Sequence, residues 1–85
     1  MDMSPARMRW ACRRGMLELD LFLLPFFDQC YAELSPALQV DFYHLLAEQD
    51  PEIYQWLMGY KIPVASQLLA IVEKIKAFKC DGIKA

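Results

Sequence analysis

The chain has few of the residues that build metal centres and nucleophilic active sites. Its 85 residues include one histidine, His44, and three cysteines, Cys12, Cys30 and Cys80. The cysteines are odd in number and far apart, which fits neither a disulfide framework nor a zinc-binding spacing. We therefore expect no metal site, reduced thiols, and a partly buried structural role for His44.

Glycine is also scarce, and its three occurrences, Gly15, Gly59 and Gly82, are scattered along the chain. A phosphate-binding loop needs several glycines within a few residues, so nucleotide-binding loops of that kind are excluded. Nothing indicates a serine–histidine–acid arrangement either. The sequence therefore predicts a protein that is not an enzyme and has no catalytic residues of its own.

No apolar run is long enough to span a membrane. The most apolar window, residues 17–27, is interrupted by Glu18 and Asp20 and falls well short of the roughly 20 residues a span needs. The N-terminal arginines are not followed by an apolar signal segment with a small-residue cleavage site. We expect a soluble protein that is not exported and does not insert stably into membranes.

Positive charge is missing from the middle of the chain, where no lysine or arginine lies between Arg14 and Lys61. Four arginines crowd the first 14 residues, and eight acidic residues follow before Lys61. Arginines around Trp10 could suit a nucleic acid, but the isoelectric point is near 5.2, whereas nucleic-acid-binding domains usually exceed about 9. We expect no nucleic-acid partner, and segregated charge that orients a protein partner.

Apolar residues are plentiful, at 56% of the chain, which is enough for a dense core in so short a protein. They recur at spacings of three and four, and no stretch shows the alternation of a strand. Ser-Pro and Asp-Pro pairs mark helix starts, with Ser4, Ser35 and Asp50 as N-caps. We predict an all-α single domain of five helices, at about 4–13, 16–32, 36–49, 51–58 and 64–78.

The predicted helix at 16–32 is expected to lie at the centre of the fold. One apolar stripe runs along it, and Leu17, Leu21 and Leu24 form a second. Because such a helix is apolar on most sides, we expect other helices to surround it. Pro25 is expected to kink this helix or divide it at Leu24. Val64 is expected to begin the buried stripe of the last helix.

Opposite charges meet where the first predicted helix gives way to the second, in the segment Arg13-Arg14-Gly15-Met16-Leu17-Glu18-Leu19-Asp20. Gly15 can end the first helix in the left-handed conformation or cap the second. A carboxylate in the first turn, such as Glu18, is favoured by the helix dipole. We expect Arg14 and Glu18 to lie close together and face outward. Because interface arginines pair bidentately with carboxylates, the corner predicts a protein-binding surface.

Three ordered blocks carry a resemblance to a known family. Trp10 to Met16, followed by Glu18-Leu19-Asp20, resembles the signature of the SdhE family, whose Arg-Gly-x-x-Glu motif falls on Arg14, Gly15 and Glu18. Residues 24–27 and 50–58 resemble two further blocks of that family. The resemblance implies a small five-helix bundle, in agreement with the helices predicted above.

The resemblance also implies a function. SdhE proteins assist the covalent attachment of FAD to the flavoprotein subunit of succinate dehydrogenase and, in bacteria, of fumarate reductase. The chain is then expected to be a monomeric, cytoplasmic bacterial protein that binds this subunit, while FAD belongs to the partner and is not held stably here. The alternative is an antitoxin-like interaction protein of the CptB type, paired with a membrane protein.

The same resemblance implies where the partner binds. The expected partner-binding residues are Arg7, Trp10, Arg14, Gly15, Met16, Glu18, Asp20 and Asp50. Arg14 is expected to pair with acids of the partner and Gly15 to permit close approach. Glu18 is expected to brace Arg14 or to accept hydrogen bonds from the partner.

Overall fold

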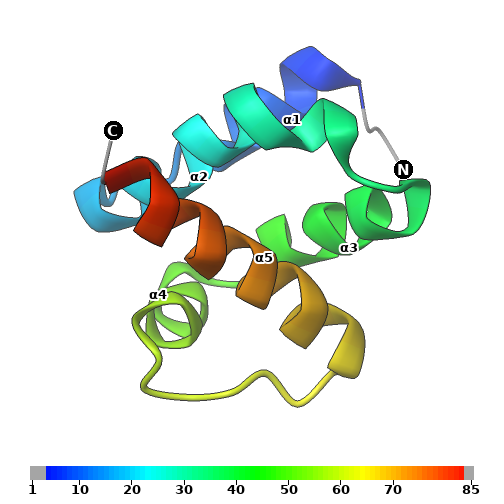
Figure 1. Ribbon diagram of the computed structural model, residues 1–85. Helices are drawn as coiled ribbons and strands as arrows, with labels where there is room; N and C mark the ends of the chain where they lie inside the picture. The colour runs from blue at the N-terminus through cyan, green and yellow to red at the C-terminus, as the bar shows by residue number, and fades with distance from the viewer. Residues whose placement is uncertain (1–3, 84–85) are drawn as a thin grey trace.

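Five α-helices form the protein, as the sequence predicts. The computed structural model describes the backbone of residues 4–83 and the side chains of residues 4–78. The helices are α1 (Pro5–Cys12), α2 (Leu17–Cys30), α3 (Pro36–Leu46), α4 (Asp50–Met58) and α5 (Ser66–Ile83), with a 3₁₀ turn, η1 (Tyr31–Glu33), after α2. The described backbone contains no strand, and α5 lies against α2, α3 and α4 (Figure 1). The all-α, five-helix prediction is confirmed.

Local signals set several helix ends. Ser4 and Ser35 hold the N-cap positions of α1 and α3, each followed by proline, as predicted. The Ser35 hydroxyl accepts a hydrogen bond from the Leu38 N–H at 3.3 Å. Gly59 ends α4 with a φ of +82°, the left-handed conformation common at helix C-termini. These ends follow from side-chain chemistry within a few residues.

The sequence suggested Asp50 as the N-cap of α4, but Asp50 does not hold that position. Gln49 holds the N-cap position and Asp50 is the first helical residue. The Asp50 carboxylate is instead bonded to Arg14, 36 residues away along the chain. A long-range contact has therefore displaced a local cap.

Other boundaries differ from the predicted ones. α3 ends at Leu46 rather than 49, and α5 extends to Ile83 rather than 78. α5 begins at Ser66, because the Ala65 carbonyl accepts the hydrogen bonds that open its first turn. Val64 therefore lies in the preceding loop and is fully exposed, so its assignment to the buried stripe is wrong.

α2 runs through Pro25 without a break, so of the two expectations for Pro25, a kink or a division at Leu24, the division is wrong. Proline cannot donate a hydrogen bond to the carbonyl four residues earlier, which belongs to Leu21. The Leu21 residue is 51% exposed, so water can reach this part of the helix and satisfy the carbonyl. The cost of an internal proline is reduced accordingly.

Two of the three residues in the second apolar stripe of α2 face solvent, whereas the third, Leu24, is half-buried against the core. Leu19, Phe22, Leu23 and Phe26 are buried, whereas Leu17 and Leu21 are 69% and 51% exposed. The expectation that other helices surround α2 is wrong, because the remaining helices cover only its buried side. Within residues 4–83, no helix combines the length and apolar character that crossing a membrane requires.

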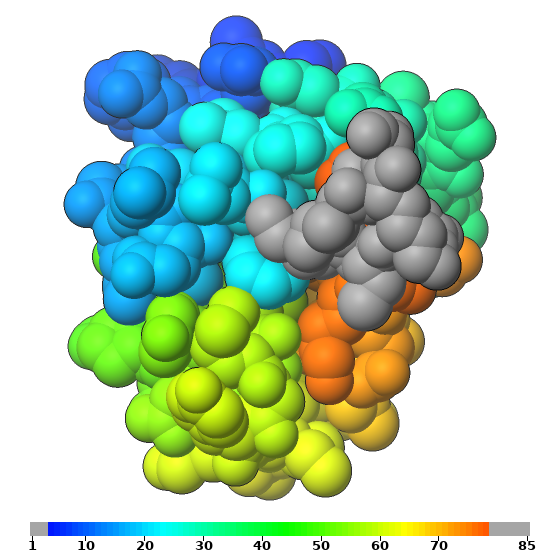
Figure 2. All heavy atoms as spheres, turned by 60° about the vertical axis from the view of Figure 1, so that its left-hand side comes forward, coloured from blue at the N-terminus to red at the C-terminus, as the bar shows by residue number. Residues whose placement is uncertain are grey.

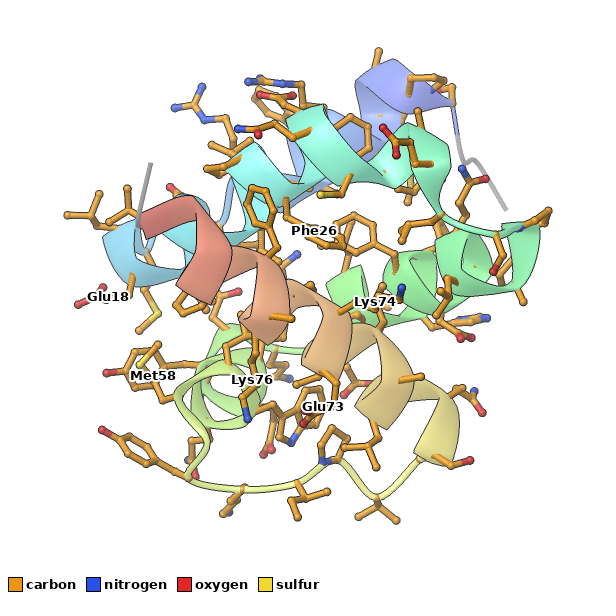
Figure 3. All side chains as sticks on the ribbon, viewed as in Figure 1. Glu18, Phe26, Met58, Glu73, Lys74 and Lys76 are labelled. Carbon is orange, nitrogen blue, oxygen red and sulfur yellow. The ribbon has the colours of Figure 1, made fainter. Side chains whose placement is uncertain are left out.

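Aromatic rings join α2, α3 and α5 at the centre of the core. The Phe26 ring centroid lies 5.7 Å from that of Phe42 and 5.7 Å from that of Phe78. Figure 3 shows Phe26 pointing from α2 into the space between these helices. His44 is exposed rather than partly buried, because it lies about 160° around α3 from Phe42, on the outer side.

Candidate partner-binding site

Residues 13–16 form the turn between α1 and α2. Gly15 has a φ of +80°, and Met16, not Gly15, is the N-cap of α2. Gly15 therefore has the expected left-handed conformation, but it neither ends α1, whose C-cap is Arg13, nor caps α2. A Cβ added to Gly15 would meet nothing within 4 Å. Backbone conformation, rather than crowding, is therefore what requires glycine here.

Arg14 bonds to three helices through its side chain. Nε donates to Asp50 Oδ1 at 2.7 Å, at the start of α4. Nη1 donates to the carbonyls of Ala11 and Leu46 at 3.0 and 2.8 Å, and Nη2 donates to the Glu48 carbonyl at 2.8 Å. We call this set of contacts, together with the bond from the Arg14 N–H to Asp20 described next, the Arg14 network.

Asp20 connects α2 to Arg14 as well. Its Oδ1 accepts a hydrogen bond from the backbone N–H of Arg14 at 2.8 Å, so the first turn of α2 is fastened to the turn before it. Asp20 also lies in the first turn, where a carboxylate interacts favourably with the helix dipole. The Arg14 network therefore connects α1, α2, α3 and α4.

Helix-end chemistry explains why an arginine occupies this position. The last carbonyls of a helix have no partner within the helix, and positive charge is favoured near them. The Ala11 and Leu46 carbonyls lie at the ends of α1 and α3, and Asp50 lies at the opposite, acid-favouring end of α4. One planar guanidinium with donors on fixed vectors can serve all of them at once.

Arg14 is consequently not the outward-facing group expected from the sequence. Its side chain is 15% exposed, and four hydrogen bonds to this chain occupy it. Glu18 is exposed and points away from the molecule (Figure 3). Among the described residues no hydrogen bond or ion pair joins Glu18 to Arg14, so the expected close pair is wrong. The helix carbonyls and Asp50 provide a better-matched set of acceptors.

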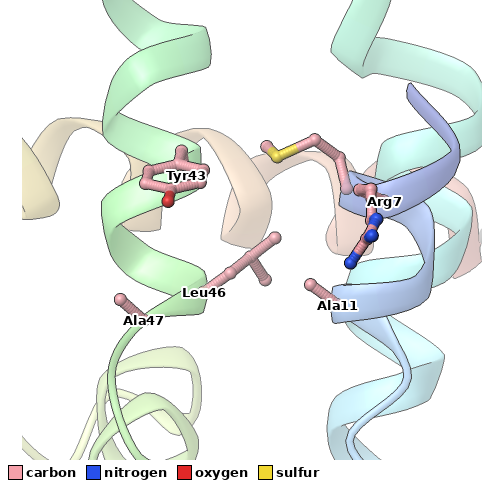
Figure 4. A pocket seen from close by; sticks show the side chains of 6 residues that line it. Arg7, Ala11, Tyr43, Leu46 and Ala47 are labelled. Atoms are coloured by element: carbon pink, nitrogen blue, oxygen red, sulfur yellow. The ribbon is translucent and has the colours of Figure 1, made fainter. Parts of the chain in front are cut away.

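The remaining expected residues have different environments. Trp10 is 72% exposed, and Met16 is half-buried against the core. Arg7 is exposed on α1 and borders a hollow of about 210 Å³ between α1 and α3 (Figure 4). Tyr43, Leu46 and Ala47 line its other side.

Three exposed residues of the corner were not singled out from the sequence. Arg13 was named in the corner segment but given no partner-binding role, while Leu17 and Leu21 were assigned to packing. Figure 2 shows the α1–α2 corner in blue at the surface, above α4 in yellow-green. The apolar stripe of Leu17 and Leu21 was visible in the sequence, but its exposure depends on where α1 lies.

The described residues offer little for metal or thiol chemistry. They contain no group of three or more histidine, cysteine or acidic side chains able to hold a metal ion. Cys12 is fully buried beneath the corner, and burial raises the pKa of its thiol to about 12. Such a thiol is protonated at neutral pH and therefore unreactive.

Comparisons with known proteins agree on one family. Residues 6–79 match a family model described as "Flavinator of succinate dehydrogenase". A Colwellia psychrerythraea protein named FAD assembly factor SdhE is 47% identical over 75 residues, covering 88% of this chain and 82% of its own. A Vibrio cholerae protein of the same name is 43% identical over 79 residues, covering 93% and 92%.

A solved structure gives the same result for the fold. The solution structure of a protein titled UPF0350 superposes with a TM-score of 0.76 at 43% identity, covering 93% of this chain and 84% of that one. The matched family segment, residues 6–79, includes the whole α1–α2 turn and every residue of the Arg14 network.

Proposed function

Because the chain belongs to the SdhE family of FAD assembly factors, we propose that it binds the flavoprotein subunit of succinate dehydrogenase. In this role it promotes the covalent attachment of FAD to that subunit. The flavoprotein subunit of fumarate reductase is a second partner of the same kind. FAD belongs to the partner, and the chain acts as a binding protein rather than as an enzyme.

The observation that carries this proposal is the match of residues 6–79 to a family described by flavinylation of succinate dehydrogenase. Relatives that are 43–47% identical over most of both chains are named FAD assembly factors. The geometry adds a surface suited to the task. Gly15 is exposed on the turn that the Arg14 network holds between helices, and Glu18 is exposed in the first turn of α2 that follows it.

The internal position of Arg14 changes the mechanism we propose. A guanidinium that is occupied by this chain's own carbonyls cannot supply charge to a partner's flavin. The contribution left to the chain is orientation: a rigid turn holds the partner in the arrangement in which its own groups bond to FAD. Among the residues that the structure describes, nothing bonds to the Glu18 side chain, so this group of the Arg-Gly-x-x-Glu motif can accept hydrogen bonds from the partner.

A complementation assay tests the function. A bacterial strain that lacks its own assembly factor is supplied with this chain, and covalent FAD on the succinate dehydrogenase flavoprotein is measured by in-gel flavin fluorescence. We expect the wild-type chain to restore the signal and Glu18→Ala to lower it by about tenfold, with an unchanged unfolding midpoint. Failure of the wild-type chain to restore covalent FAD would contradict the proposal.

A pull-down from the same strain identifies the partner. We expect the soluble flavoprotein subunit to be the dominant protein captured by the wild-type chain. Capture of a small membrane protein in its place would favour the antitoxin-like alternative and count against the assembly role.

A further inference from the structure

The outer side of the α1–α2 pair carries large apolar side chains that the described part of the chain leaves exposed. Trp10 is 72% exposed, Leu17 is 69% exposed and Leu21 is 51% exposed. Arg13 and Glu18 are exposed among them. We call Trp10, Arg13, Leu17, Glu18 and Leu21 the hairpin face.

Helix geometry places these residues on one side. At about 100° per residue, Leu17, Glu18 and Leu21 fall within roughly a quarter of the circumference of α2. Asp28 lies on the same stripe, and its carboxylate accepts hydrogen bonds from Arg9 of α1 at 2.8 and 3.0 Å. This pair crosses between the two helices on their outer side, so it shows where the outer surfaces of α1 and α2 join.

Arg13 and Trp10 continue that surface along α1. Arg13 is the C-cap residue that directly follows α1, one residue after Cys12. The Arg13 N–H donates to the Trp10 carbonyl at 3.1 Å, so this turn of the chain is formed. The tryptophan and the second arginine therefore border the Leu17–Leu21 stripe at the corner.

The charges of the hairpin face are unused within the described residues. Neither Arg13 nor Glu18 has a hydrogen-bonded or ion-paired side-chain partner there, whereas Arg9 is paired with Asp28 and Arg14 with Asp50. Single exposed apolar residues are ordinary on protein surfaces. Here three large apolar side chains lie beside an arginine and a glutamate that have no partner among the described residues. This composition matches that of binding hot spots, in which tryptophan and arginine are enriched.

We propose that the hairpin face is the docking surface for the flavoprotein partner, with Arg13 rather than Arg14 as its cation. The partner surface it fits is apolar, with a carboxylate opposite Arg13 and a hydrogen-bond donor opposite Glu18. This inference rests on the proposed function. Two observations select that occupant: the face is continuous with the Gly15–Glu18 turn of the family-matched segment, and its unpaired charges require complementary ones.

Binding measurements with purified proteins test the surface. The wild-type chain and its variants are titrated into the succinate dehydrogenase flavoprotein subunit by calorimetry. We expect Arg13→Ala and Leu17→Ser each to weaken binding by about tenfold or more, with unchanged unfolding midpoints. Arg9→Ala and Ile62→Ser are the matched controls, since Arg9 is a nearby paired arginine and Ile62 is 74% exposed in the α4–α5 loop. Both controls are expected to bind within about twofold of wild type.

The two tryptophans provide a second measurement in one sample. Trp10 is exposed and Trp56 is 7% exposed, so ¹⁹F NMR of the 5-fluorotryptophan-labelled chain reports the face and the core separately. Adding unlabelled flavoprotein subunit is expected to shift and broaden the Trp10 signal, with little chemical-shift change at Trp56. Equal shifts at both positions would contradict a localised surface.

The outcomes separate this inference from the function on which it rests. If wild type binds and supports flavinylation while Arg13→Ala and Leu17→Ser bind equally well, the hairpin face is wrong and the function stands. If wild type neither binds the flavoprotein nor supports flavinylation, the function itself fails. If the purified chain forms dimers that Leu17→Ser disperses, a second copy covers the face and the proposed occupant is overturned.

Discussion

Arg13 and Arg14 are consecutive residues whose side chains lie in opposite surroundings. Arg14 is enclosed by carbonyls and carboxylates of its own chain, whereas Arg13 is exposed on the hairpin face. Arg13 has extended backbone angles, φ −85° and ψ 104°, and successive side chains of an extended segment point to opposite sides. Because α1 ends at Cys12, the chain is extended at Arg13, and this separates an external arginine from an internal one.

This contrast assigns different tasks to neighbouring residues. The Arg14 network joins the ends of α1 and α3 to the starts of α2 and α4, so it determines the shape of the corner. The side chains of the hairpin face are largely exposed in the part of the chain that the structure describes, so they can make contacts elsewhere. Substitutions in the network should therefore change stability, and substitutions in the face should change binding.

Replacing Arg14 is expected to have the largest effect on stability. Arg14→Met leaves the Leu46 and Glu48 carbonyls and the Asp50 carboxylate without their donor, in a site where the arginine side chain is 15% exposed. We expect the free energy of unfolding to fall by about 2–4 kcal/mol, measured by urea denaturation. Arg13→Met is the matched control and should change it by less than about 0.5 kcal/mol. If the two variants were equally stable, the different roles assigned to Arg13 and Arg14 would be wrong.

Cys12 reports local opening of the same corner. The residue is fully buried and burial raises its pKa to about 12, so native alkylation requires the structure to open. Iodoacetamide labelling at pH 8, followed by mass spectrometry of the Cys12 peptide, should be fast only in urea. In Arg14→Met we expect the labelling rate without urea to rise by about thirtyfold or more, which corresponds to a loss of about 2 kcal/mol in the free energy of opening. A rate unchanged from wild type would show that the network does not hold the corner closed.

Gly15 should show a smaller effect that comes from its backbone alone. Gly15→Ala forces a β-carbon into a φ of +80°, although nothing lies within 4 Å of it. We expect a loss of about 1 kcal/mol in urea denaturation, and about half of that for Gly15→Asn, since asparagine tolerates the left-handed region better. If alanine proves neutral, the turn can adopt another conformation and the rigidity assigned to it is wrong.

The sequence was sufficient to predict the helices, but it was not sufficient to predict which groups the charged residues bond to. Ser35-Pro36 and Gly59 act within a few residues, so the helix ends that depend on them were predictable. Arg14 finds acceptors 32 to 36 residues away, and most are backbone carbonyls, which have no signature in a sequence. Periodicity likewise identified the Leu17–Leu21 stripe, but only the packing of α1 decides that it faces solvent.

The smallest expected effect concerns the ion pair beside the hairpin face. Hydrogen bonds from Arg9 lower the pKa of Asp28 below its ordinary value. A carboxyl whose pKa is lowered on folding stabilises the protein above the unfolded pKa of about 3.9, and the stabilisation is lost as the pH falls through the lowered value. In Arg9→Ala the NMR titration of Asp28 should return toward that ordinary value, whereas Arg13→Ala should leave it unchanged. If Arg13→Ala changed the pKa of Asp28 as much as Arg9→Ala does, Arg13 would share this ion pair. The docking surface depends on Arg9 being paired and Arg13 being available, so that result would contradict it.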